Sequence, residues 1–137
     1  MSRLLAVALL FAVATLAPAE DKEMKEAIID IGNDKGDKIE TEKGSVTKPT
    51  AVTTEEDLKK VIPDEDTRKR IAKLVDFKEQ KLLIFAWKGS GGDKLDYKVF
   101  ERYPELIHFN VTPGKSDDLR SHVKLFAVRN NVAWQVK

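Results

Sequence analysis

The sequence predicts an α+β domain in which short N-terminal helices pack on a mainly antiparallel β-sheet. Three observations support this fold class. Helical patterns come first, at residues 55–75, segments with the apolar pattern of strands dominate the rest of the chain, and turn residues separate those segments. Strands that follow one another with short connections favour a sheet rolled into a sandwich or a half-barrel.

Residues 1–19 are expected to be a signal peptide. Arg3 supplies a positive start, an apolar run covers residues 4–16, and Ala17-Pro18-Ala19 fits the small-residue rule for cleavage before Glu20. The run is shorter than the roughly 20 residues that a membrane-spanning helix needs. We therefore expect an exported bacterial protein, periplasmic or extracellular, with no integral membrane span after cleavage.

The charge balance limits the classes of partner, and the cysteine content limits the interactions that can stabilise the fold. The chain has 24 Lys and Arg against 23 Asp and Glu, so it carries no strong overall field to attract nucleic acid or an anionic membrane. It has no cysteine, so no disulfide supports the fold and the core alone must stabilise it. We expect neither a nucleic-acid partner nor a cofactor.

Residues 20–47 are polar, and we expect them to form a mobile N-terminal arm ahead of one α+β domain at residues 48–137. One apolar cluster, Ile28-Ile29-Asp30-Ile31, predicts a brief strand within the arm. The acidic residues that follow do not fit a calcium loop, because Lys35 falls where a ligand is needed.

Two helices are predicted at the start of the domain. An extended segment at residues 48–53 leads to Thr54, an N-cap for a helix at residues 55–62. Pro63 ends that helix and Asp64 caps the next one. The second helix has three acid-before-base pairs on its exposed face, Asp64–Arg68, Glu65–Lys69 and Asp66–Arg70, and a core-facing stripe formed by Ile71, Leu74 and Val75.

The central strand is predicted at residues 82–87, where both faces are apolar and both must therefore be covered. A glycine-rich turn follows, and then Leu95, Tyr97 and Val99 alternate with charged residues, as in a half-buried strand. We interpret the two segments as a β-hairpin.

Further strands are predicted at residues 106–111, 122–128 and 132–136. Ile107, Phe109 and Val111 are assigned to the core side of the first of them. Thr112-Pro113-Gly114 is a strong turn signal, and a polar loop continues from it to Ser121.

No pattern for nucleophilic catalysis or phosphate binding is present. None of the serines in the predicted loops lies in a nucleophile elbow. Ser90 lies in Gly89-Ser90-Gly91-Gly92, which is followed by the anion Asp93 and a strand, whereas a phosphate loop needs a helix there. We therefore expect a non-catalytic protein, with Ser90 as a candidate binding residue in a turn.

Two alternatives remain open. His108 and His122 lie on strands joined by the Thr112–Ser121 loop, and with Asp117 or Asp118 they are weak candidates for a metal site or a hydrolytic centre. Trp87 and Trp134 lie near strand ends. Their sequence pattern favours burial in the core, and exposed rings at these positions would instead suit a carbohydrate-binding module.

The Thr112–Ser121 loop is longer than a tight hairpin needs, which favours a functional role. Arg120, after Asp117-Asp118-Leu119, is a candidate to clamp a carboxylate of a partner. Alternatively, Arg120 pairs with Asp117 or Asp118 and fixes the shape of the loop. The candidate binding residues are Arg120, Asp117, Asp118, Trp87 and Ser90.

Residues 48–137 resemble a group of small, exported, uncharacterised bacterial proteins. The similarity rests on Lys48-Pro49-Thr50, Asp76-Phe77, Phe85-Ala86-Trp87-Lys88-Gly89-Ser90-Gly91, Asp93-Lys94-Leu95, Thr112-Pro113-Gly114, Asp118-Leu119-Arg120, His122 and Leu125-Phe126-Ala127-Val128. More remotely, the segment order resembles the C-terminal domain of the protease-complex subunit PrcB, which implies a small β-rich domain that contacts or stabilises a protease. The chain departs from that family at its Gly-Ser-Gly-Gly turn, where the family tends to carry a Pro-Thr-Gly-Gly-Tyr type of segment.

These observations favour a non-catalytic exported binding or accessory domain that contacts another exported protein or an envelope polymer through its loops. A metal-dependent or hydrolytic enzyme and a carbohydrate-binding module are the alternatives.

Overall fold

The structure is a computed structural model that describes residues 26–32, 39 and 46–137. The predicted signal peptide and most of the predicted arm lie outside the described residues. Within the described part, no helix has the length and apolar character needed to cross a membrane.

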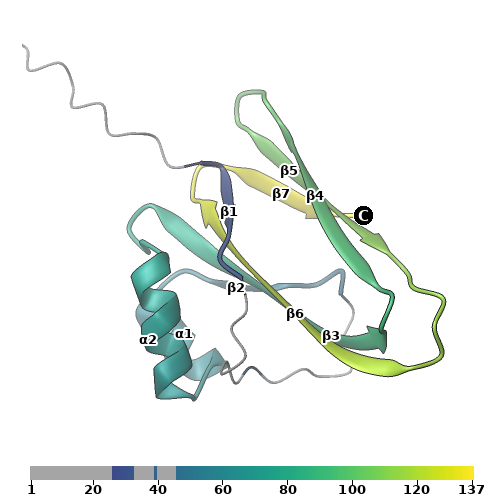
Figure 1. The fold of residues 1–137 in the computed structure, drawn as a ribbon. Coiled ribbons are helices and arrows are strands. Elements are labelled where there is room, and N and C mark those ends of the chain that lie inside the picture. Colours follow the sequence, from purple (N-terminus) through teal and green to yellow (C-terminus); the bar gives the residue numbers. More distant parts are fainter. Residues whose placement is uncertain (1–25, 33–38, 40–45) are drawn as a thin grey trace, which may run out of the picture.

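The chain forms two helices and two mainly antiparallel sheets, which confirms the α+β prediction (Figure 1). The four-stranded sheet has the order β1-β6-β3-β2 and the three-stranded sheet the order β4-β5-β7, in which β5 and β7 are parallel. The elements in chain order are β1 (Ile28–Asp30), β2 (Thr50–Val52), α1 (Glu55–Val61), α2 (Glu65–Leu74), β3 (Gln80–Ser90), β4 (Lys94–Phe100), β5 (Leu106–Thr112), β6 (Leu119–Arg129) and β7 (Ala133–Val136).

The four-stranded sheet is the middle of three layers, with the helices on one face and the other sheet on the opposite face (Figure 1). On β3, Leu83 and Phe85 pack toward the three-stranded sheet, where Phe85 contacts Phe109 with 4.9 Å between ring centroids. Leu82 and Ile84 alternate with them and pack under the helices. The prediction that this strand is covered on both faces is confirmed.

The predicted hairpin is wrong, because β3 and β4 belong to different sheets. β3 pairs with β2 and β6, whereas β4 pairs with β5. The Asp93 N–H donates to the Ser90 carbonyl oxygen at 3.0 Å, so the turn is tight, but the chain leaves one sheet and enters the other there. A strand that is apolar on both faces, such as β3, fits the middle layer, whereas a half-buried strand, such as β4, fits the outer sheet. The different patterns of the two strands therefore agree with their places in different sheets.

The helix caps are confirmed. The Thr54 hydroxyl accepts a hydrogen bond from the Asp57 N–H, and the Asp64 carboxylate accepts one from the Thr67 N–H, both at 3.1 Å. Of the predicted pairs on α2, Glu65–Lys69 forms at 3.2 Å. Arg68 instead donates to the carbonyl oxygens of Ile62 and Pro63, at 3.0 and 2.7 Å.

The apolar stripe of α2 is narrower than predicted. Ile71 and Val75 are buried, but Leu74 is 47% exposed, so its assignment to the core was wrong. Residues four apart share a helix face, and the face shared by Ile71 and Val75 is the one turned toward the sheet. Leu74 is the last residue of the helix and lies outside that contact.

The brief strand predicted within the arm is confirmed as β1. Ile28 is buried and lies opposite Val128 of β6. Arg70 of α2 donates to the Ile31 carbonyl oxygen at 3.4 Å. The four-stranded sheet therefore includes a strand that precedes Lys48.

Candidate functional site

Two connections between the sheets meet at one end of the molecule, at the lower right of Figure 1. One is the β3–β4 turn and the other is the β5–β6 loop. Both are shorter than predicted, because Ser90 is the last residue of β3 and Arg120 already belongs to β6. The Ser90 and Ser116 hydroxyls lie 2.7 Å apart in a hydrogen bond, and the Ser116 N–H donates to the Ser90 hydroxyl oxygen at 3.1 Å. The Gly114 N–H donates to Asp93 Oδ1 at 2.7 Å. We call the joined segments, residues 89–93 and 112–120, the loop junction.

Glycine allows this close contact. A Cβ atom added at Gly114 would lie 2.4 Å from the carbonyl carbon of Gly92 and 2.6 Å from the Asp93 nitrogen. Both are backbone atoms, so no side chain can swing away to make room. The Pro-Gly sequence that predicts a turn thus also lets two loops touch through their backbones.

Asp118 is the centre of the hydrogen-bond network. Its Oδ1 accepts from the Gly91 N–H at 3.1 Å and from the Ser116 hydroxyl, and its Oδ2 accepts from Arg120 Nε at 2.5 Å. The Ser116 hydroxyl, the Gly91 N–H and Arg120 together lower the pKa of Asp118 to about 2, outweighing the opposing effect of desolvation. At neutral pH Asp118 is therefore a carboxylate with both oxygens engaged.

Arg120 is held by one nitrogen and exposes the rest of its guanidinium. Nε bonds to Asp118, while its side chain is 71% exposed and its two terminal nitrogens have no partner in the described part of the chain. The predicted internal pair is thus present with Asp118. It leaves free the two nitrogens with which arginine binds a carboxylate in a two-pronged manner.

Trp87 and His122 lie beneath the network. Their rings stack with 4.9 Å between centroids, and Trp87 Nε1 donates to Asp93 Oδ2 at 3.3 Å. His122 Nε2 lies 2.7 Å from the Ser90 carbonyl oxygen, which can only accept, so this nitrogen carries the proton. Trp87 is only 3% exposed, which confirms the core position that its sequence pattern favours and contradicts the alternative of an open ring.

Two other candidate residues, His108 and Asp117, do not take part in the network at the loop junction. His108 lies on β5, where Phe100 and Gln135 contact its ring, so the two histidines belong to different sheets and have different neighbours. Among the described residues, no group of three or more His, Asp or Glu side chains is placed to hold a metal. Asp117 is exposed and has no hydrogen bond or ion pair within the described ranges.

The second tryptophan packs inward. The Trp134 ring is half-buried and meets Phe109 edge-on with 6.4 Å between centroids. Since Trp87 is buried as well, the two rings do not form the open platform on which a sugar would stack.

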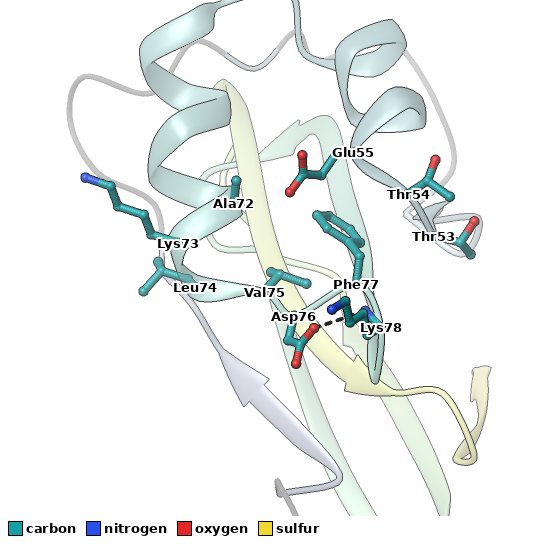
Figure 2. Close-up of a pocket in the computed structure, with 10 residues that line it drawn as sticks. All are labelled: Thr53, Thr54, Glu55, Ala72, Lys73, Leu74, Val75, Asp76, Phe77 and Lys78. Carbon is teal, nitrogen blue, oxygen red and sulfur yellow. Dashed lines mark hydrogen bonds between the residues drawn. The ribbon is translucent and has the colours of Figure 1, made fainter.

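Figure 2 shows a separate groove between the start of α1 and the end of α2, with a volume of about 580 Å³. The Phe77 ring lies between the two helix ends. Two polar side chains that line the groove already accept hydrogen bonds from the backbone. Thr54 caps α1, and Asp76 Oδ1 accepts from the Lys78 N–H at 3.1 Å. The lining residues are Thr53, Thr54, Glu55, Ala72, Lys73, Leu74, Val75, Asp76, Phe77 and Lys78.

The loop junction brings together four of the five binding candidates, namely Ser90, Trp87, Asp118 and Arg120. Sequence reasoning did not include Asp93, Gly114 or Ser116 among the candidate site residues, although these residues join the two loops. Asp93 and Gly114 belong to the segments that carry the resemblance described above. Their place in these segments was the feature of the sequence that could have marked them as site residues.

Comparison of the chain with protein-family models, curated protein sequences and solved structures finds no match. The resemblance to PrcB therefore stays a prediction.

Proposed function

We propose that this chain is a non-catalytic, exported binding or accessory domain that contacts another protein or an envelope polymer through the loop junction. The observation that supports this most is Arg120, whose Nε is fixed by Asp118 while its terminal nitrogens face solvent. An arginine that is already oriented loses less side-chain entropy when it binds a carboxylate.

The hydrogen bonds of the junction favour recognition over catalysis. The Ser90 hydroxyl bonds to Ser116 and to the Gly92 N–H, whereas a nucleophilic serine needs a base beside it. His122 uses Nε2 on a carbonyl oxygen, and Asp118 is too acidic to donate a proton near neutral pH. The same bonds hold both loops in one shape, which suits a preformed contact surface.

Export is part of the proposal and rests on the sequence of residues 1–19. The partner would then be another exported protein or a component of the cell envelope. The remote resemblance to PrcB is consistent with a protein partner.

The proposal is tested with the mature chain immobilised and exposed to envelope extract, with captured material quantified by mass spectrometry. Arg120→Ala is expected to reduce capture of the specific partner about tenfold or more, since a hydrogen-bonded charge pair contributes about 1.5–3 kcal/mol. The melting temperature should change little, because exposed ion pairs contribute at most about 1 kcal/mol.

Lys124→Ala is the matched control, since Lys124 is an exposed cation on the same strand as Arg120. It should capture as much as the unaltered chain. Equal capture by the Arg120 variant and the control would contradict the proposal, as would an unaltered chain that retains nothing above blank beads.

A further inference from the structure

The outer face of the three-stranded sheet is a second surface with a distinct character. The helices cover the other sheet, and no described element covers this face (Figure 1). Alternation places Leu95, Ile107 and Phe109 toward the core, so the residues between them on β4 and β5 point outward. Lys98 and His108 are opposite one another on this outer face.

Cations gather around His108. Desolvation, then Lys137, Arg102 and Lys98, lower its pKa, so all three basic side chains lie close enough to oppose its protonation. The Lys98 ammonium lies 5.2 Å from the centre of the Phe100 ring, and that ring lies 4.5 Å from the imidazole. The exposed Lys98 side chain thus lies against the Phe100 ring on this face.

Little negative charge balances these cations. On the outward positions of β4, β5 and β7, the one carboxylate is Asp96. Glu101 adjoins Arg102 in the connection between β4 and β5, so two carboxylates, those of Asp96 and Glu101, stand against the basic side chains of this region. The basic residues are in excess here, whereas the whole chain has nearly equal numbers of acidic and basic residues. The Gln135 amide, next to His108 in register, and Asn110, opposite Asp96, add neutral hydrogen-bonding groups.

We propose that this face binds an acidic polysaccharide, with Lys98, Arg102 and Lys137 meeting the carboxylates of the polymer and Gln135 its hydroxyl groups. A folded protein partner would need an apolar centre for its interface. Phe100 is 37% exposed and already contacted by Lys98 and His108, so the strands of this face offer no such centre, and the fully exposed Tyr103 lies beyond them in the connection between β4 and β5.

Single-stranded nucleic acid is disfavoured as well, because its successive bases stack on a row of free aromatic rings. Here the Phe100 ring is already contacted, and the exposed Tyr103 ring offers a single stacking position. A polymer with regularly spaced carboxylates needs only the dispersed cations and amides that are present. None of the residues assigned to polymer binding on this face belongs to the loop junction, so the two surfaces are separate sites.

The test measures retardation of the mature chain in native gels that contain a polyuronate, with neutral dextran as the reference polymer. The double variant Lys98→Ala/Arg102→Ala is expected to weaken retardation about tenfold in apparent Kd at low salt. Retardation of the unaltered chain should decline as salt rises, because the contacts are exposed.

The control is Lys59→Ala/Lys73→Ala, which removes two exposed cations from the helices and changes the net charge equally. It should change the apparent Kd less than about twofold. Equal weakening by both double variants, no retardation of the unaltered chain by polyuronate, or tighter binding to polyglutamate or an oligonucleotide would overturn the inference. Arg120→Ala should retain polyuronate binding, which separates failure at this face from failure at the loop junction.

Discussion

Replacing Gly114 by alanine inserts a methyl group between two backbones that are already in contact. The new carbon would lie 2.4 Å from the Gly92 carbonyl carbon and 2.6 Å from the Asp93 nitrogen, where ordinary contacts begin near 3.4 Å. The loops must move apart by about 1 Å, and the 2.7 Å bond from the Gly114 N–H to Asp93 is then stretched beyond hydrogen-bonding range.

The cost follows from these two effects. Overpacking of this kind typically costs about 1–3 kcal/mol, and loss of a partly buried hydrogen bond adds about 1 kcal/mol. We expect Gly114→Ala to lower the free energy of unfolding by about 2–4 kcal/mol, a large part of the roughly 5–15 kcal/mol of a typical domain. Urea denaturation monitored by tryptophan fluorescence measures the loss, and Trp87 reports on the junction directly.

Gly92→Ala is the matched control on the other side of the same contact. Its added carbon would lie 3.2 Å from the Gly114 Cα and 3.7 Å from the Lys115 nitrogen, so a shift of a few tenths of an ångström accommodates it. We expect it to cost less than about 1 kcal/mol. If both variants unfold at the urea concentration of the unaltered chain, the loops are not in contact and the reasoning is refuted.

Three further predictions concern the core, acid stability and export. Phe85→Ala should lower the free energy of unfolding by about 3–5 kcal/mol, because Phe85 is fully buried between the sheets. Leu74→Ala, at a half-exposed position, should lower it by less than about 1 kcal/mol. Similar denaturant midpoints for the two variants would contradict the assignment of Phe85 to the layer between the sheets. The Asp118 carboxylate should stabilise the fold fully above its unfolded pKa of about 3.9, and this contribution should be lost as the pH falls toward the folded value of about 2. Urea midpoints between pH 5 and pH 2 measure it, and an Asp118→Asn variant with an unchanged pH profile would show that the carboxylate is not held. Intact-mass analysis of exported material should find Glu20 at the N-terminus, and a retained leader would refute the cleavage prediction.

Local patterns in the sequence predicted the elements that depend on neighbouring residues. The caps at Thr54 and Asp64 and the alternation around Phe109 involve residues only a few positions apart, and the structure confirms them. The hairpin failed because strand pairing depends on which sheet can cover each strand, which is a property of the whole fold. The prediction that Leu74 is buried was wrong because helical spacing identifies the apolar face of a helix but not the point along the helix where its contact with the sheet ends.

The candidate site was recognised in parts but not as one unit. The pairing of Arg120 with Asp118 was one of two readings, since the two residues are close in sequence. The contact between Ser90 and Ser116 spans 26 positions, and no local pattern indicates it. Trp87 was placed near a strand end, but β3 continues to Ser90 and the ring lies on the same face as Phe85, in the core between the sheets.

The most direct test of the central claim is amide hydrogen exchange at the loop junction, resolved by residue with NMR. The account predicts slowed exchange of the Gly91, Gly114 and Ser116 amides, since each donates a hydrogen bond across the two loops. The Asp117 amide, which has no bond within the described residues, should exchange at the rate of an open loop and serves as the internal reference. Exchange of all four amides at that rate would contradict the claim that the loops form one surface that holds Arg120 in place.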